Sequence, residues 1–316
     1  TRTNDSLCDP KHPVNLTAIP FPVANYTMAI APKTKGQEDK VANGLVRLSE
    51  EDMTFHCVNN AETRQMVLTG TGDIQLSVLC AKLKDRFGVE VTLSPARVPY
   101  REKIRKKVKV EGKHKKQSGG HGQYGDVWIE FEPCDSEELV FAENVFGGSV
   151  PKNFFPAVEK GLRDSVQHGV LAGYPVVYLK ATLVDGSYHP VDSSEMAFKT
   201  AASLAYKAGL AQANPVLLEP IGELHVIVPD SYTGDVMGDL NKRRGRVMGM
   251  NPVEAGEQEI VAEVPMGEMG TYAIDLRSMT QGRGMFTYAF LRYEDTPPAV
   301  QEKAIAEAKQ MQGDEE

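Results

Sequence analysis

The spacing of hydrophobic residues in the first third of the chain predicts helices alternating with strands. Apolar residues recur at helical spacing in two stretches, and Gly88 marks the expected end of the second. Shorter apolar stretches around them predict strands. The helices are expected at 38–52 and 72–88, and the strands at 54–60, 65–70 and 89–95. With one earlier strand, this order is the ferredoxin-like pattern βαββαβ.

The same succession of patterns returns near the end of the chain. A strand, a helix, two strands, a short helix and a last strand are expected at 221–229, 230–244, 245–252, 259–265, 269–278 and 284–294. We therefore expect a second ferredoxin-like domain over residues 218–297.

The stretch between these domains combines long strands with helices. Polar and apolar residues alternate from Asp126 to Glu132, which predicts a strand with one apolar face. Further elements are expected as a helix at 151–167, a strand at 175–186, a helix after Asp192 and a last helix at 298–310. Asp192 as N-cap, with Glu195 three residues later, matches a capping box. The fold class is therefore α+β and multidomain: two ferredoxin-like domains flank an α+β domain with a long basic hairpin.

One glycine-rich stretch, "SGGHGQYGDVW" (118–128), contains the spacing Gly120-x-Gly122-x-x-Gly125 of dinucleotide-binding loops. Such a loop binds pyrophosphate where it opens a helix, because the free N–H groups of the first turn face the phosphates. A strand pattern follows these glycines instead. We interpret the stretch as a hairpin tip and not as a nucleotide site.

The charge of the chain is unevenly distributed. The formal net charge is −8, yet residues 97–116 contain ten Lys or Arg against Glu102 and Glu111. A basic stretch on an acidic chain indicates a directed contact with a polyanion, and a solvated, charged strand face is the alternative.

The basic stretch leads directly to the glycine-rich tip, through Lys113, Lys115 and Lys116. Glycines allow close backbone approach, and the polar side chains among them suit bases, ribose and phosphates. These polar side chains are those of Ser118, His121 and Gln123. The combination favours RNA as the polyanion.

Motifs of catalytic and metal sites are missing from the sequence. GxxxxGK[ST], HExxH, GxSxG and CxxC do not occur, and the four cysteines are far apart, as in a protein of a reducing cytoplasm. We predict no catalytic residue and no metal site. A hydrolase using His189 and Asp192 is the alternative from another class, and it requires a pocket around His189. No apolar run approaches the roughly 20 residues of a membrane helix, so no membrane partner is expected.

A second basic cluster, Lys242, Arg243 and Arg244, lies at the end of the predicted helix 230–244. The helix dipole stabilises cations at this position, and the same cations are suited to a phosphate backbone.

Several longer motifs resemble the C-terminal half of bacterial elongation factor G. They are "GGHGQYGDV", "GGSVPKNFFPAVEKGL", "DGSYHPVDSSEMAFK", "LLEPIGELHV", "GDVMGDLNKRRGRVMGM" and "DLRSMTQGRGMF". The resemblance implies that residues 1–8 are the tail of a preceding β-barrel domain and that residues 9–99 are the third domain. Residues 100–217 together with 298–310 would form the fourth domain, and residues 218–297 the fifth. It also implies that the GTPase domain, which holds GTP and Mg²⁺, lies outside this chain, so no cofactor is expected here.

The resemblance implies a ribosomal role for the fourth domain. In the family, its tip enters the small-subunit decoding centre during translocation of tRNA and mRNA. The tip residues implied here are Ser118, Gly119, Gly120, His121, Gly122, Gln123, Asp185, Gly186, Ser187, Tyr188 and His189. Gln123 and His189 match residues that contact the codon–anticodon region. The fifth domain would approach large-subunit rRNA, and a cytoplasmic monomer is expected.

Three positions depart from the family pattern. His121 stands where the family usually has Arg, Gln75 replaces a His, and Ser77 replaces a Glu. These departures suggest a divergent paralogue as the alternative, such as a tetracycline-resistance ribosomal protection protein or a recycling or rescue factor. The tip motif "GGHGQYG" argues against a protection protein.

Overall fold

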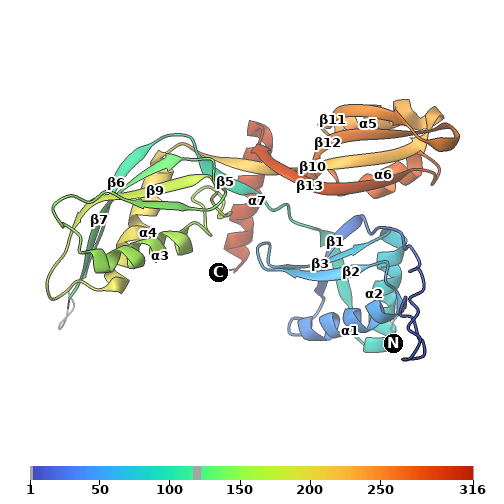
Figure 1. Cartoon of the computed structure of the whole chain (residues 1–316), viewed down its shortest axis with the longest axis horizontal. Helices are drawn as coiled ribbons and strands as arrows, with labels where there is room; N and C mark the ends of the chain where they lie inside the picture. Colours follow the sequence, from blue (N-terminus) through green and yellow to red (C-terminus); the bar gives the residue numbers. More distant parts are fainter. Residues whose placement is uncertain (1–2, 117–121, 316) are drawn as a thin grey trace. The chain divides into compact units, whose positions relative to one another are not determined.

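The structure is a computed structural model that describes residues 3–116 and 122–315 (Figure 1). It contains helices and mainly antiparallel sheets in a multidomain α+β arrangement, which confirms the predicted fold class. The chain divides into two compact units, which we describe separately. One unit contains residues 1–99 and 220–292, and the other contains residues 100–219 and 293–316.

The N-terminal part of the first unit is a ferredoxin-like domain. Its elements are β1 (Tyr26–Pro32), α1 (Glu38–Glu51), β2 (His56–Asn60), β3 (Gln65–Gly70), α2 (Asp73–Phe87) and β4 (Val91–Pro95). The strands pair antiparallel in the order β2-β3-β1-β4. Leu45 of α1 and Leu76 of α2 are buried in the shared core, as the helical spacing predicts. Gly88 ends α2 in the left-handed conformation that favours glycine.

The C-terminal part of the first unit repeats this topology. Its elements are β10 (Pro215–Pro229), η2 (Asp230–Tyr232), α5 (Thr233–Lys242), β11 (Arg246–Pro252), η3 (Glu254–Gly256), β12 (Glu257–Pro265), η4 (Met266–Glu268), α6 (Tyr272–Met279) and β13 (Met285–Asp295). The strand order β11-β12-β10-β13 matches that of the first sheet. Residues 215–219 of β10 and 293–295 of β13 belong to the second unit. Leu224 and Val226 alternate with outward residues along β10, so one face of the sheet forms the core.

The second unit is built on a separate four-stranded sheet. Its elements are β5 (Arg101–Ile104), β6 (Val108–Lys116), β7 (Gln123–Pro133), β8 (Val140–Glu143), η1 (Lys152–Phe154), α3 (Phe155–Ser165), β9 (Leu179–Ser187), α4 (Glu195–Gln212) and α7 (Pro298–Glu315). The sheet order is β6-β7-β9-β8, and only the β8–β9 pair is parallel. Helix α3 forms the connection between these two parallel strands.

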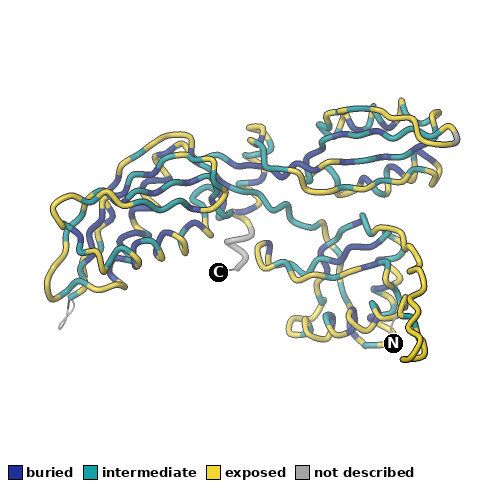
Figure 2. The backbone as a smooth tube through the Cα atoms, in the orientation of Figure 1, coloured by how far each residue is buried: buried dark blue, intermediate teal, exposed yellow. Residues whose placement is uncertain are grey.

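Helix α4 lies close against β6 and β7, on the same side of the sheet as α3 (Figure 1). Two glycines make this approach possible. A Cβ on Gly112 would lie 2.1 Å from the carbonyl oxygen of Ala201, and one on Gly125 would lie 2.5 Å from that of Ala197. The interface is therefore closed by backbone contact and by buried apolar side chains, such as those of Phe131 and Phe198. Figure 2 shows where the backbone of the chain is buried and where it is exposed.

Helix α7 completes the second unit. Ala304 and Ala308 are buried against Leu217 and Ala172 in a small separate core. Helix α7 begins at Pro298, as expected. The segment that returns to the second unit begins at Tyr293, and in it Asp295 pairs with Lys103 at 2.6 Å and with Arg105 at 2.9 Å. No helix of the described residues is both long and apolar enough to cross a membrane.

Candidate RNA-binding tip

Strands β6 and β7 form the predicted hairpin and pair in register as far as Lys116 and Gln123. The backbone continues as β7 after the glycines and does not open a helix, so the dinucleotide-binding geometry is excluded. Four predicted tip residues, Ser118, Gly119, Gly120 and His121, lie outside the described residues. Gly122 and Gln123 are described and form the return of the hairpin.

The second predicted tip segment, Asp185 to His189, begins within a strand. The strand expected at 175–186 is observed as β9, which ends at Ser187. Strand β9 has a bulge at Val184, and its pairing with β7 continues beyond the bulge, where Asp185 lies opposite Trp128. Asp185, Gly186 and Ser187 are therefore strand residues, and the turn proper begins at Tyr188. Tyr188 and His189 are both exposed.

The structure joins the hairpin to the His189 turn by backbone contacts. The amide of Tyr124 donates to the carbonyl of Asp192 at 2.8 Å, and the Ser193 hydroxyl donates to the carbonyl of Tyr124 at 2.9 Å. The amide of Gly122 donates to the Asp192 carboxylate at 3.1 Å. Two segments about 70 residues apart in the chain thus form a single surface feature, which we call the tip: residues 122–124 and 188–193.

The predicted capping box at Asp192 is wrong. Helix α4 begins at Glu195, and its N-cap is Ser194, whose side chain accepts from the amide of Ala197 at 3.2 Å. Asp192 lies before the helix because the chain first pairs with Tyr124 through Ser193. Its carboxylate bonds to the hairpin instead of the helix.

Gln123 is exposed, but its side chain has a partner within the hairpin. Its Oε1 lies 2.9 Å from Nε2 of His114 on the facing strand. This contact orients the side-chain amide of Gln123 within the tip.

A polar cluster that the sequence did not predict lies next to the tip, on strands β7 and β9. The hydroxyls of Tyr124 and Ser187 lie 2.7 Å apart, and Ser187 donates to the Asp126 carboxylate at 2.6 Å. Asp126 is 6% exposed, and its Oδ1 lacks a hydrogen-bond partner within the described residues. Lys113 lies 3.6 Å from the other carboxylate oxygen, and this charge raises the pKa of Lys113. The only sign of this cluster in the sequence is Asp126, at the start of the alternating polar and apolar residues that predict the strand.

Several cations of the basic stretch form ion pairs within the second unit. Lys107 contacts Glu130 at 2.8 Å and Glu132 at 3.3 Å. Lys103 and Arg105 share Asp295, as described above. The stretch is therefore less basic in space than in sequence, because strands β6 and β7 place opposite charges side by side.

Lys115 and Lys116 are exposed at the end of β6, and neither forms an ion pair within residues 3–116 and 122–315. The same holds for the exposed Lys106 and Lys109, although Lys109 lies over the Trp128 ring at 5.8 Å. Lys113 is tied to Asp126, so the unpaired charge of the predicted arm lies at these two residues.

The second basic cluster is also partly neutralised. The Arg243 side chain is 12% exposed, and its guanidinium contacts Asp239 at 2.7 Å and Asp275 at 2.5 Å. It also lies over the Tyr272 ring at 5.2 Å. Arg244 contacts Glu268 at 3.1 Å, whereas Lys242 is exposed. Of the three predicted rRNA contacts, Lys242 is the one directed to solvent.

Three family models match consecutive parts of this chain. They describe elongation factor G domain III at residues 20–95, domain IV at 96–214 and the C-terminus at 216–304. The chain belongs to the elongation factor G family. A crystal structure of a protein from Thermus thermophilus is similar, with 40% identity and a TM-score of 0.85 over 97% of this chain. The match covers 46% of that protein, so this chain spans about half of its length.

The tip belongs to the elongation factor G domain IV match, and the Lys242–Arg244 cluster belongs to the C-terminal match. The matched regions are those of domains III, IV and the C-terminus, and the GTPase domain is not among them.

The domain III departures from the elongation factor G pattern are accommodated locally. The Gln75 side chain accepts from the amide of Thr71 at 2.7 Å and donates to Asp52 at 2.9 Å. Burial opposes ionisation of Asp52, but hydrogen bonds from Thr54 and Gln75 keep its pKa below the ordinary value. Ser77 donates to the carbonyl of Asp73 at 2.9 Å. Both replacements thus have partners within domain III.

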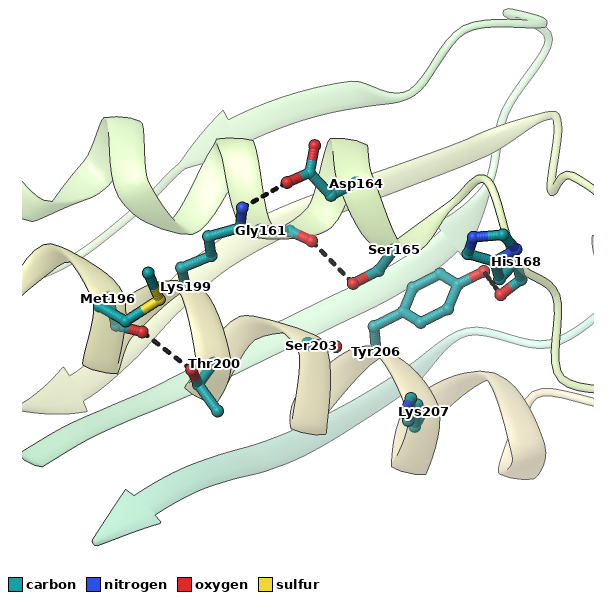
Figure 3. Close-up of a pocket in the computed structure, with 10 residues that line it drawn as sticks. All are labelled: Gly161, Asp164, Ser165, His168, Met196, Lys199, Thr200, Ser203, Tyr206 and Lys207. Atoms are coloured by element: carbon teal, nitrogen blue, oxygen red, sulfur yellow. Dashed lines mark hydrogen bonds and ion pairs between the residues drawn. The ribbon is translucent and has the colours of Figure 1, made fainter. Parts of the chain in front are cut away.

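A groove of about 530 Å³ lies between α3 and α4 of domain IV (Figure 3). Lys199 crosses it to Asp164 at 2.5 Å, and the Tyr206 hydroxyl donates to the carbonyl of His168 at 3.1 Å. Neither His189 nor Asp192 lines this groove. His189 lies on an exposed turn, which does not favour a hydrolase site there.

The side chains that could bind a metal ion are dispersed. Within the described residues, no three His, Cys, Asp or Glu side chains come close enough together to hold one.

Proposed function

We propose that this chain is the ribosome-binding, C-terminal portion of an elongation factor G-like translational GTPase, and that it promotes translocation of tRNA and mRNA. The observation that carries the proposal is the convergence of the hairpin return and the His189 turn at one end of domain IV, beside the exposed Lys115 and Lys116. An exposed tip with polar side chains and adjacent cations suits a structured RNA.

In this proposal, domain IV enters the small-subunit decoding centre, and the C-terminal domain contacts large-subunit rRNA through Lys242. GTP and Mg²⁺ would be bound by a GTPase domain of the longer, monomeric and cytoplasmic protein. The chain then divides as expected from the resemblance: a β-barrel tail at 1–8, followed by domains at 9–99, 100–217 with 298–310, and 218–297.

Binding of the chain to purified ribosomes, measured by pelleting at increasing salt, tests the proposal. Because phosphate contacts release counterions, we expect the logarithm of the binding constant to fall steeply and linearly with the logarithm of the salt concentration. Binding that is absent at low salt, or that does not respond to salt, would contradict the proposal.

The tip's role in translocation is tested in the longer protein. Gln123→Ala and His189→Ala should each slow translocation while GTP hydrolysis stays nearly unchanged, because both side chains lie on the tip. Equal loss of the two activities would show that the residues act elsewhere in the cycle.

A further inference from the structure

The imidazole of His189 is held by the backbone of its own turn. Its Nδ1 lies 3.3 Å from the amide nitrogen of Val191 and 3.1 Å from that of Asp192, and both amides donate to it. The same Nδ1 also lies 3.4 Å from Oδ2 of Asp192, farther than from either amide. The two amides can only donate, so they place the proton of the neutral ring on Nε2. The side chain is 51% exposed, which leaves the Nε2–H group as a donor for an external acceptor.

Asp192 connects this imidazole to the hairpin. Its amide donates to His189, its carbonyl accepts from Tyr124, and its Oδ1 accepts from Gly122. The approach at Gly122 is close: a Cβ there would lie 2.9 Å from the Asp192 carboxyl group. Asp192 is thus hydrogen-bonded both to the imidazole of His189 and to Gly122 of the hairpin return.

The carboxylate of Asp192 is available for the contact with Gly122 because it does not cap helix α4. Ser194 caps α4, so Asp192 has no capping role. The side chain is 21% exposed, and a carboxylate that accepts from a backbone amide in such a position forms a stronger bond than a neutral acceptor does.

We propose that Asp192 is a positioning residue of the tip. It holds the hairpin return against the His189 turn, so that His189 presents Nε2–H to an oxygen acceptor on RNA, a phosphate or ribose oxygen. The RNA acceptor rests on the proposed function, whereas the geometry of the clasp, which we define as the contacts of Asp192 with Gly122, Tyr124 and His189, does not.

Ring ¹⁵N–¹H correlation spectra of the 316-residue chain test the clasp without ribosomes. The chain has seven histidines, and the signals missing from His189→Gln identify those of His189. We expect the neutral ring of the wild type to carry its proton on Nε2, because both amides donate to Nδ1. A neutral ring with its proton on Nδ1 would overturn the proposal.

Variants of Asp192 separate positioning from charge. Asp192→Asn keeps an oxygen acceptor for Gly122, while Asp192→Ala removes it, and both remove the same charge. We expect the His189 signals of the Asn variant to remain close to wild type and those of the Ala variant to shift toward a mixture of tautomers. Identical spectra for wild type and Ala would overturn the proposal.

Ribosome binding gives the second readout. We expect Asp192→Ala to bind about fivefold to tenfold more weakly than Asp192→Asn, the effect of losing one hydrogen bond to an oriented group. Asp164→Ala, which removes an exposed carboxylate beside the α3–α4 groove, is the matched control and should resemble wild type. Equal binding by the Asn and Ala variants would overturn the positioning role.

A third variant covers the case in which Asp192→Ala does not fold. Gly122→Ala removes no side chain of the clasp, but its Cβ would displace the Asp192 carboxylate by contact, so it should reproduce the altered His189 spectrum. An unchanged spectrum would overturn the proposal. Failure of wild-type chain to bind ribosomes, with the spectra as expected, would refute the proposed function alone.

Discussion

The two basic clusters of the chain look alike in sequence and differ in the structure. Arg243 lies at the end of α5 and is enclosed by two carboxylates and an aromatic ring, while Lys115 and Lys116 end a strand and remain exposed. The difference arises from the neighbours that the fold brings to each cluster. A run of cations therefore indicates an RNA contact only where carboxylates from other elements do not reach it.

The largest expected effect is that of Arg243→Ala on stability. Removing this largely enclosed cation leaves Asp239 and Asp275 without their partner, which should lower the free energy of unfolding of the C-terminal domain by about 2 kcal/mol. Denaturant unfolding, with hydrogen exchange to localise the loss, measures it. The neighbouring exposed Lys242→Ala is the control, with an expected change below about 0.5 kcal/mol. Equal losses would remove the distinction between the clusters.

The next effect is that of Lys115→Ala combined with Lys116→Ala on ribosome binding. Loss of two phosphate contacts should reduce the slope of log binding constant against log salt by about two, with about tenfold weaker binding at low salt. Lys152→Ala with Lys160→Ala changes two exposed lysines elsewhere in the same domain and is the matched control. The same slope in both double variants would mean that the position of the lysines is irrelevant.

Acid should weaken the C-terminal domain through the enclosed cluster. A hydrogen bond from Thr271 and the charge of Arg243 keep the pKa of Asp275 below its ordinary value of 3.8. A carboxyl whose pKa is lowered in the folded state stabilises the fold above its unfolded pKa, and this contribution is lost as the pH falls through the folded value. Unfolding of this domain should become easier from about pH 4 downward. Arg243→Ala should make this dependence shallower, and an unchanged pH dependence would show that Asp275 does not depend on Arg243.

The smallest effect is expected for Lys242→Ala on binding. A single exposed lysine accounts for at most about one unit of the salt slope, and we expect about a twofold loss of affinity. The effect should add to that of the Lys115 and Lys116 variants, because the sites lie in different domains. A loss larger than that of the double variant would place the main RNA contact in the C-terminal domain.

The elements with regular spacing were the ones that the sequence predicted well. Val41, Leu45 and Leu48 recur on one face of α1 and are all buried, and Gly88 ends α2 as expected. Local patterns suffice here because a helix that buries one face must repeat its apolar residues with the helical period.

Predictions failed where the outcome depended on distant partners. The sequence pattern around Asp192 is that of a helix start, yet the carboxylate bonds to Gly122, which is 70 residues away. The cluster of Asp126, Ser187 and Tyr124 joins two strands, and no local spacing announces it.

From the order of its residues alone, this protein could be read as two ferredoxin-like domains around a domain with a basic hairpin, because hydrophobic period and turn residues act over short distances. Only the folded chain decided which cations stay exposed and which carboxylate joins the hairpin to the His189 turn. Hydrogen bonds and ion pairs require atoms within a few ångströms, and for residues far apart in the chain that proximity is created by tertiary structure.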